Sequence, residues 1–533
     1  MRRNNRTTEA QAALTVSPEW LQQTADAIAR RNGILLTDCV TLAEEGSATE
    51  LPSAVALANI EAAVEGLRHT LVEQVEASHA RTRGSRGDCA EDVKERQLYV
   101  DVMVRLAVTV ALARSYCPEP QSRHNGGGDG PESGGEGPSQ RYYDTLARGM
   151  LHVFEAFQEV HSMQRGHYMA RRRGGSTVGT VGWDTLLLLH FVHRIPRVAR
   201  DASEHVIDEA TGQIVRSWRK LLQSLQAADP QESPEHSRRR GALAVCNGLL
   251  SILFHRYNTH QCRILLNAVA QSEKAAESTQ DPGKSILRPA QHMTAEVVNF
   301  CYYKGRIMLY DHRFAEAYAA LQEAYYLLPP PGGGTEVQQR NKQRVRFYLT
   351  VAGIMHGRVV PEEILRTDDL IAFVFMPILA AVQRGDPEAF ATAVDAFGTL
   401  LRKRGVFFIL QRAKLYCFLV LLVRTHAALG ACGVDNSRVP LPVLTAAYAH
   451  VVEEGHAAAA AAAATKPKRP KRHRDDGDAL STAAAMTDDK MTWWTAKLIA
   501  ADLVRGYVSY EHKTIVLSRQ VPFPTLGTPL PPP

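Results

Sequence analysis

Positively charged side chains crowd a short stretch in the C-terminal half of the sequence, where they could bind phosphate groups or an acidic protein. The segment LRKRGVFFILQRAKLYCFLVLLVR, residues 401–424, contains six Lys or Arg residues and no Asp or Glu. Cations without compensating acids attract polyanions. A solvated face on a buried helix is the structural alternative. Within this segment, the predicted nucleic-acid contacts are Arg402, Lys403, Arg404 and Lys414.

A second basic stretch, KPKRPKRHR, has six Lys or Arg residues in nine positions. Its prolines favour an extended chain, and nuclear-import receptors read the side chains of extended segments. A non-specific basic loop, including one that binds phosphate, is the alternative. The residues of the predicted nuclear-localisation signal are Lys466, Lys468, Arg469, Lys471, Arg472 and Arg474.

A third basic group follows the paired tryptophans Trp493 and Trp494. We predict that its members also bind nucleic acid: Lys497, Arg505, Lys513 and Arg519. The tryptophans could stack on bases, but more often one such side chain is in the core and its neighbour is half-buried at an interface. Trp494, Leu498 and Ala501 share one helical face, which we expect to be buried.

No motif in the sequence predicts catalysis. The histidine pairs, His190 with His193 and His161 with His167, lack a cysteine or carboxylate at a strong zinc spacing. The eight cysteines form no CxxC pair, and no P-loop, GxSxG or HExxH motif is present. The sequence therefore predicts no enzyme, no cofactor and no metal site. No apolar run reaches the length of a membrane span, so we also expect no membrane insertion.

Helical periodicity covers most of the 533 residues, interrupted by segments rich in Gly, Pro and Ser. The predicted organisation, in chain order, is a helical region at 1–117, a flexible loop at 118–140, a helical solenoid at 141–290, the last solenoid hairpins and associated helices at 291–433, a winged helix at 434–524 with a low-complexity basic insertion at 455–488, and a Pro-rich tail at 525–533.

Two elements explain how these residues would be positioned. In residues 295–329, small and aromatic side chains recur at the spacing of a tetratricopeptide-like helical hairpin, among them Gly305 and Ala317. Near the end, three helices precede GYVSYEHKTIVLSRQVPFP, which reads as a β-hairpin. Helices followed by a hairpin indicate a winged helix. We expect Gly506 to stop the last helix and Tyr507, Ile515 and Leu517 to pack inward.

The segments WLQQTADAIARRNG, KGRIMLYDHRFAEAYAALQEAY and GYVSYEHKTIVLSRQVPFP resemble the PCI-domain family, especially its members in the nuclear-pore-associated transcription–export complex 2. The resemblance implies an all-α solenoid followed by a C-terminal winged-helix subdomain. It covers both ends and most of residues 290–524, and is weaker from 118 to 290. The segments 118–140 and 455–488 look like insertions relative to the family.

The resemblance also implies a function. Such subunits are non-catalytic scaffolds for mRNA export in the nucleus and at nuclear pores. They dock a GANP-type scaffold subunit and a small acidic protein shared with the proteasome lid, and contact RNA or DNA through phosphates. A winged-helix reader of duplex sequence offers several Arg, Asn or Gln side chains on its recognition helix, and this chain offers few. The alternative is a subunit of a signalosome or proteasome-lid assembly that binds proteins only.

Overall fold

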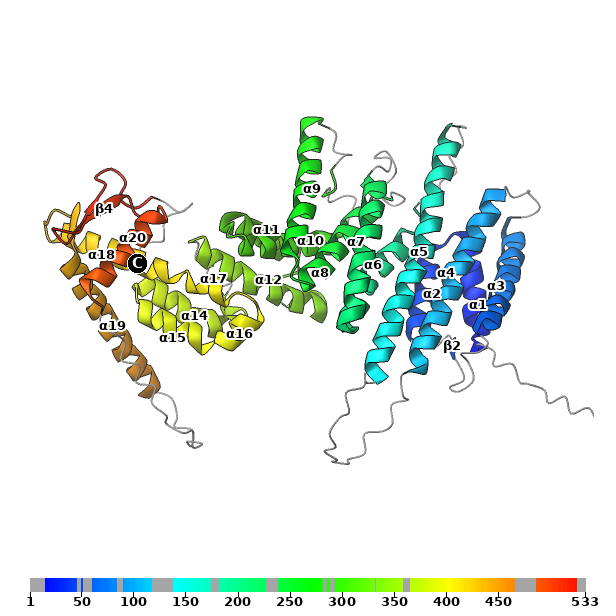
Figure 1. Ribbon diagram of the computed structural model, residues 1–533, viewed down its shortest axis with the longest axis horizontal. Helices are drawn as coiled ribbons and strands as arrows, with labels where there is room; N and C mark the ends of the chain where they lie inside the picture. The colour runs from blue at the N-terminus through cyan, green and yellow to red at the C-terminus, as the bar shows by residue number, and fades with distance from the viewer. Residues whose placement is uncertain are drawn as a thin grey trace, which may run out of the picture. The chain divides into compact units, whose positions relative to one another are not determined.

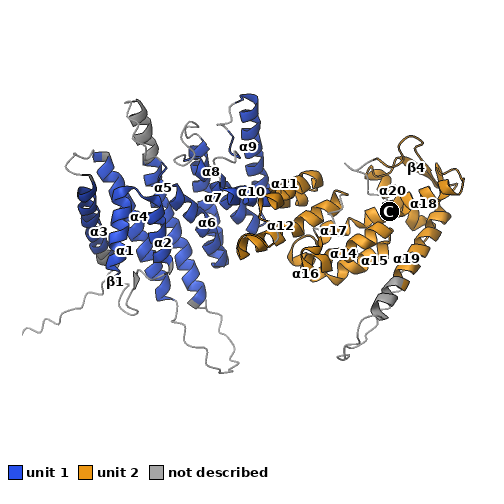
Figure 2. Ribbon diagram, turned by 180° about the vertical axis from the view of Figure 1, so that it is seen from behind, with its two compact units in different colours: residues 1–303 blue, residues 304–533 orange. Residues whose placement is uncertain are grey.

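The computed structural model describes residues 15–45, 49–50, 60–83, 90–116, 138–173, 182–226, 238–280, 285–287, 293–330, 332–357, 365–464 and 486–524. Helices make up most of the described chain (Figure 1). The chain divides into two compact units, unit 1 (residues 1–303) and unit 2 (residues 304–533), coloured separately in Figure 2. Among the described helices, none is long and apolar enough to cross a bilayer.

Unit 1 consists of packed helices and one small strand pair. Its helices are α1 (Pro18–Arg30), α2 (Gly33–Glu45), α3 (Ile60–Arg83), α4 (Ala90–Ser115), α5 (Pro138–Arg173), α6 (Thr185–Asp201), α7 (Glu204–Gln226), α8 (Arg240–His255), α9 (Thr259–Ser278) and the first part of α10 (Thr294–Tyr310). Strand β1 (Thr15–Val16) pairs antiparallel with β2 (Thr49–Glu50).

Helix α1 shows how the sequence pattern forms these elements. Pro18 is its first residue, and its apolar face, which includes Trp20 and Ile28, is buried as the 3.6-residue period predicts. Arg31 follows the helix in the left-handed region, with φ 52°. Its guanidinium lies 2.8 Å from the Asp92 carboxylate and 2.6 Å from that of Glu95, which ties the end of α1 to α4.

Unit 2 contains the rest of the described elements. Its helices after α10 are α11 (Phe314–Leu327), α12 (Glu336–Met355), α14 (Asp369–Arg384), α15 (Pro387–Ala396), α16 (Gly398–Lys403), α17 (Phe407–Gln411), α18 (Lys414–Ala431), α19 (Leu441–Ala464) and α20 (Asp488–Ala500). Its strands are β3 (Arg438–Pro440), β4 (Gly506–Ser509) and β5 (Thr514–Leu517).

The predicted helical hairpin is present as α10 and α11. Gly305 allows the two helices to approach closely, since a Cβ atom at this position would lie 2.5 Å from Cγ of Leu321. Ala317, Ala320 and Ala324 of α11 are buried. The small residues therefore lie where α10 and α11 pack closely, as their spacing in the sequence predicted.

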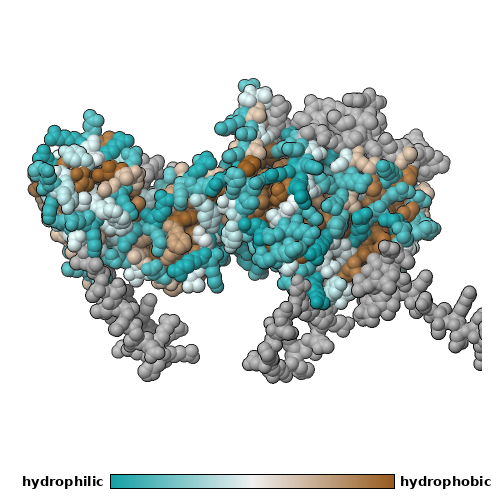
Figure 3. Space-filling view, viewed as in Figure 1, coloured by the Kyte–Doolittle hydropathy of each residue, from teal (hydrophilic) through white to brown (hydrophobic). Residues whose placement is uncertain are grey.

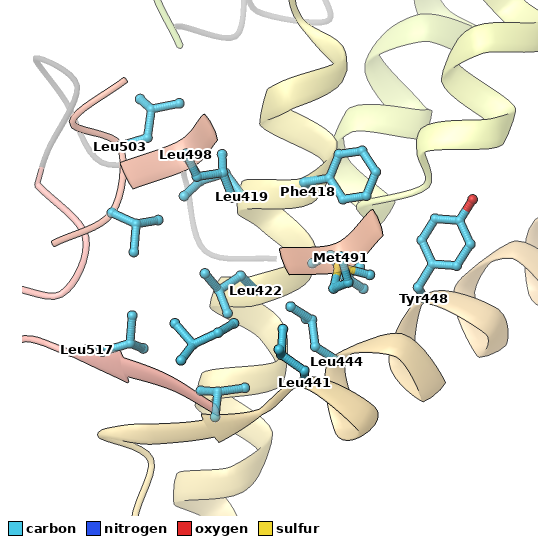
Figure 4. Packing of buried hydrophobic residues seen from close by; sticks show 14 residues of the cluster. Phe418, Leu419, Leu422, Leu441, Leu444, Tyr448, Met491, Leu498, Leu503 and Leu517 are labelled. Carbon is cyan, nitrogen blue, oxygen red and sulfur yellow. The ribbon is translucent and has the colours of Figure 1, made fainter. Parts of the chain in front are cut away.

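The C-terminal part of unit 2 is a winged helix. In chain order it runs α18, β3, α19, α20, β4 and β5, and its antiparallel sheet has the strand order β3-β5-β4. Apolar side chains from the three helices and from β5 converge on one core, including Leu422, Leu444, Met491 and Leu517 (Figure 4). The predicted fold class, an all-α solenoid followed by a winged helix, is confirmed.

Two features of this subdomain differ from the sequence prediction. Strand β3 was not expected, and it converts the predicted hairpin into a three-stranded sheet in which Val439 lies opposite Ile515. Helix α19 continues to Ala464, whereas the predicted insertion began at 455, because the alanine run is itself a strong helix former. Helix α18 lies before residue 434, where we placed the start of the winged helix, yet Phe418 belongs to its core.

Three expectations for single residues are wrong. Gly506 does not stop α20, which ends at Ala500 with Ala501 as its C-cap; Gly506 begins β4. Tyr507 does not pack inward and is 61% exposed, because the next residue, Val508, packs against the core and successive side chains of a strand point to opposite faces. Ala501 is exposed as well. Leu498, Ile515 and Leu517 are buried as expected.

Candidate nucleic-acid interface

The eight predicted nucleic-acid-binding residues all lie in the described part of unit 2, but on separate elements. They form three groups: Arg402, Lys403 and Arg404 at the end of α16; Lys414 and Lys497 beside the paired tryptophans; and Arg505, Lys513 and Arg519 around the strands of the winged helix. Within the described part of unit 2, no ion pair or ring contact links one group to another, and binding of nucleic acid by these residues stays a prediction.

The first group is held by aromatic side chains. The Arg402 guanidinium carbon lies 4.4 Å from the centre of the Phe407 ring, and that of Arg404 lies 5.6 Å from the Phe347 ring. Such contacts orient a guanidinium without neutralising it. Within the described part of the chain, Lys403 forms no ion pair, and it is exposed. Among the described residues, none of these three cations forms an ion pair with a carboxylate; Arg402 and Lys403 are exposed and Arg404 is partly buried.

A tight turn fixes where this group is presented. Gly405 follows α16 with φ 72°, and a Cβ atom there would lie 2.6 Å from the Tyr310 hydroxyl oxygen. The Tyr348 hydroxyl donates a hydrogen bond to the Arg404 carbonyl oxygen at 3.1 Å. The backbone conformation of Gly405 and the hydrogen bond from Tyr348 together position the cations at the end of α16.

In the second group, lysines of α18 and α20 flank the two tryptophans. The Lys497 ammonium lies 3.5 Å from the centre of the Trp493 ring and 5.3 Å from that of Trp494. Lys414 lies 6.0 Å from the Trp494 ring and 3.8 Å from a carboxylate oxygen of Glu388. Trp494 stacks on Phe418 at 4.3 Å between ring centres.

Carboxylates accompany the third group. The Lys513 ammonium lies 3.5 Å from Asp488, and the Arg505 guanidinium 3.9 Å from Asp502. Hydrogen bonds from Ser437, with a smaller contribution from Arg519, lower the pKa of Asp435. These pairs are largely exposed, so each contributes little to stability and can be exchanged for a phosphate at small cost.

The predicted nuclear-localisation residues, from Lys466 to Arg474, lie outside the described residues. So does His167.

The described histidines of the predicted pairs are held by acids. His190 lies 3.1 Å from Glu44, and His193 lies 2.7 Å from Glu296. Among the described residues, no group of three or more histidines, cysteines or acids could hold a metal ion.

Sequence reasoning missed one cluster that resembles catalytic machinery in its residue types. His161 Nδ1 lies 2.8 Å from an Asp184 carboxylate oxygen, which also accepts a hydrogen bond from the Tyr99 hydroxyl at 2.9 Å. All three side chains are almost completely buried, so a substrate would not reach them. The cluster joins α4, α5 and the start of α6. No spacing signal could have found it, because the residues are 23 to 85 positions apart.

Known proteins are similar to this chain over more than half its length. No protein-family model matches the chain. PCI domain-containing protein 2 of Xenopus laevis is 23% identical over 342 residues, which cover 62% of this chain and 70% of the relative. The Danio rerio protein of the same name is 22% identical with the same coverage. COP9 signalosome complex subunit 12 of Eremothecium gossypii is 22% identical over 59% of this chain and 68% of the relative.

Proposed function

Because this chain belongs to the PCI-domain family, we propose that it is a non-catalytic scaffold subunit of a nuclear mRNA-export complex. The observation that carries the proposal is the winged helix with the order α18, β3, α19, α20, β4, β5, which follows the helical hairpins of unit 2. The relative named COP9 signalosome complex subunit 12 supports the choice of an assembly subunit over an enzyme.

In this role, the exposed cations of unit 2 contact RNA or DNA through phosphates. Lys403 and Lys497 form no ion pair within the described part of the chain, and the pairs of Lys513 and Arg505 are exposed. Binding of this kind is insensitive to base sequence and weakens as the salt concentration rises, because counterions compete for the phosphates.

The protein partners are a GANP-type scaffold subunit and a small acidic protein of the proteasome-lid type. Exposed aromatic side chains support docking on unit 2: Phe373 is 67% exposed and Phe408 is 75% exposed. Figure 3 shows that hydrophilic residues cover most of the coloured surface on one face, with apolar areas between them. The acidic partner would suit the Arg402–Arg404 group, which forms no ion pair within the described part of the chain.

Affinity purification of the full chain from nuclear extract tests the assembly. Recovery of a GANP-type scaffold together with pore proteins is the expected result. A triple charge reversal, Arg402→Glu with Lys403→Glu and Arg404→Glu, should weaken both nucleic-acid binding and recovery of the acidic partner. Unchanged values for both would remove these residues from the interface.

A second candidate keeps the fold and changes the assembly to a signalosome or proteasome-lid type that binds proteins only. It is favoured by the relative named COP9 signalosome complex subunit 12 and by several named CSN12 homologues. The same purification separates the candidates, since recovery of signalosome or lid subunits without pore proteins would support the second and contradict the first.

Nuclear location is part of the first proposal, with Lys466–Arg474 as the import signal. Deleting these residues should move a fluorescently tagged chain from the nucleus to the cytoplasm. Nuclear accumulation that persists after the deletion would show that this segment is not the sole signal.

A further inference from the structure

Helix α20 carries one aromatic side chain, Trp493, that lies outside the core of the winged helix. Trp493 is 52% exposed, whereas its neighbour Trp494 stacks on Phe418 and joins the core. The two indoles meet edge to face at 4.8 Å between ring centres. Trp494 thereby holds Trp493 in place at the surface.

A second exposed ring lies near the start of the same helix. The hydroxyl of Tyr510, from the turn between β4 and β5, lies 3.4 Å from the Asp489 carboxylate. Asp489, Trp493 and Lys497 are four residues apart and so share one face of α20. Tyr510, which is 69% exposed, therefore lies next to Asp489, one helical turn before Trp493 on the same face of α20.

Charge along this face argues against insertion into duplex DNA. Asp488 and Asp489 occupy the first turn of α20, the end that a recognition helix directs at base edges. Carboxylates there would approach the phosphates that line the major groove. The lysines lie elsewhere: Lys497 one turn beyond Trp493, and Lys414 on α18 within 6.0 Å of the Trp494 ring.

We propose that Trp493 is a stacking platform for a base of single-stranded nucleic acid, with Lys497 and Lys414 binding the adjacent phosphates. The inference deepens the proposed nucleic-acid role and rests on it. An unpaired base can lie flat on an exposed indole, which a base inside a duplex cannot do. The Lys497 ammonium lies over this ring at 3.5 Å, so a base that stacks on the same face displaces it, and the displaced ammonium can then bind the phosphate of the stacked nucleotide.

The test measures fluorescence anisotropy of the full chain with three labelled ligands. They are an oligothymidine single strand, an abasic oligomer with the same number of phosphates, and a duplex of the same length. Wild-type protein should bind the oligothymidine about 5- to 150-fold more tightly than the abasic strand, the range expected for loss of one stacked base. It should bind the duplex more weakly than the oligothymidine.

Variants identify the residue. Trp493→Ala should bind oligothymidine and the abasic strand equally, while Trp493→Phe should retain most of the difference. Tyr507→Ala is the matched control, since Tyr507 is an exposed aromatic residue of the same subdomain on the outer side of β4. Circular dichroism melts confirm that each variant is folded.

The outcomes separate this inference from the proposed function. Equal wild-type affinity for all three ligands would leave phosphate binding intact and overturn the stacking platform. The platform is also wrong if Trp493→Ala keeps the full preference for bases, or if it alters only recovery of a protein partner. No wild-type binding to any ligand would contradict the nucleic-acid role itself, and the platform with it.

Discussion

Asp184 shows how a single buried carboxylate can be kept ionised inside unit 1. Burial opposes its ionisation, but attraction to His161 and Arg238 and hydrogen bonds from His161 and Tyr99 outweigh that effect, and the pKa of Asp184 lies below its usual value. Burial also raises the pKa of Tyr99 well above its usual value, which keeps the hydroxyl protonated as the donor. The ionised Asp184, at the start of α6, therefore links α4 and α5 through Tyr99 and His161.

Replacing Asp184 by Asn should destabilise unit 1 by about 3 kcal/mol, because it removes one partner of a buried charged network. Tyr99→Phe, which removes one hydrogen bond and leaves the charge, should cost only about 1 kcal/mol. Urea unfolding followed by the fluorescence of Trp183, whose ring lies 4.7 Å from that of Tyr99, measures both changes.

The same carboxylate predicts a dependence on pH. Since its pKa in the folded protein is below the unfolded value of about 3.9, its contribution to stability is present above roughly pH 4 and is lost as the pH falls through the folded pKa. Wild type should therefore lose more stability than Asp184→Asn over that acidic range. Equal losses in the two proteins would show that Asp184 is not the group responsible.

At this scale, residue types were easier to predict than residue partners. The run Arg402–Arg404 could be identified from its lack of nearby acids in the sequence, and among the described residues these side chains form no ion pair. The pairing of Lys513 with Asp488 could not be predicted, because the two residues are brought together only when β5 closes the sheet. Spacing along the chain carries no information on such contacts.

The packing of two helices depends on how closely their backbones can approach. In the hairpin of α10 and α11, Gly305 permits that approach. Gly305→Ala should destabilise the protein by about 1–3 kcal/mol, since the new methyl group would overlap the fully buried Leu321. Gly212→Ala is the matched control: Gly212 lies inside α7 with open space around it and should gain about 0.5–1 kcal/mol from better helix propensity.

Thermal unfolding followed by circular dichroism measures both glycine variants. If the two substitutions shift the melting temperature in the same direction, close approach at Gly305 is not what fixes the hairpin.

The sheet of the winged helix makes a second prediction at this scale. Ile515→Ala should cost about 2–5 kcal/mol because Ile515 is fully buried in the core of the winged helix, on the central strand between β3 and β4. Tyr507→Ala, on the outer side of the adjacent strand, should change stability by no more than about 0.5 kcal/mol. Chemical denaturation of the full chain distinguishes them, and a large effect of Tyr507→Ala would restore the inward orientation that the sequence suggested.

Long periodic elements were predictable, while short ones were not. Apolar residues recur along one face of α1, and small residues recur along α11. Each repetition adds support for a helix, so the sequence pattern alone was sufficient to predict both. Strand β3 has only three residues and ends in a proline, so no alternation could be recognised. It exists because Val439 fits the core beside Ile515, which is a tertiary effect that sequence pattern does not contain.

For the whole molecule, affinity for nucleic acid depends on how many separate cations meet phosphates. Each phosphate contact should contribute about 0.7–0.9 to the slope of log affinity against log salt concentration. Lys403→Gln should reduce that slope by about one contact. Lys513→Gln should reduce it less, because Lys513 already shares its charge with Asp488. Titrations at several salt concentrations measure the slopes, and equal effects of the two variants would contradict a role for the ion pair.

The strand order β3-β5-β4 also has a consequence for biosynthesis. The central strand is the last of the three to be translated, and more than seventy residues separate it from its first partner, since Pro440 lies opposite Thr514. While the ribosome makes the intervening segment, β3 has no strand to pair with, and the apolar faces of α18 and α19 lack part of their cover. A chain interrupted before β5 would therefore expose apolar surface that is prone to aggregation, and would become a substrate for chaperones or proteases.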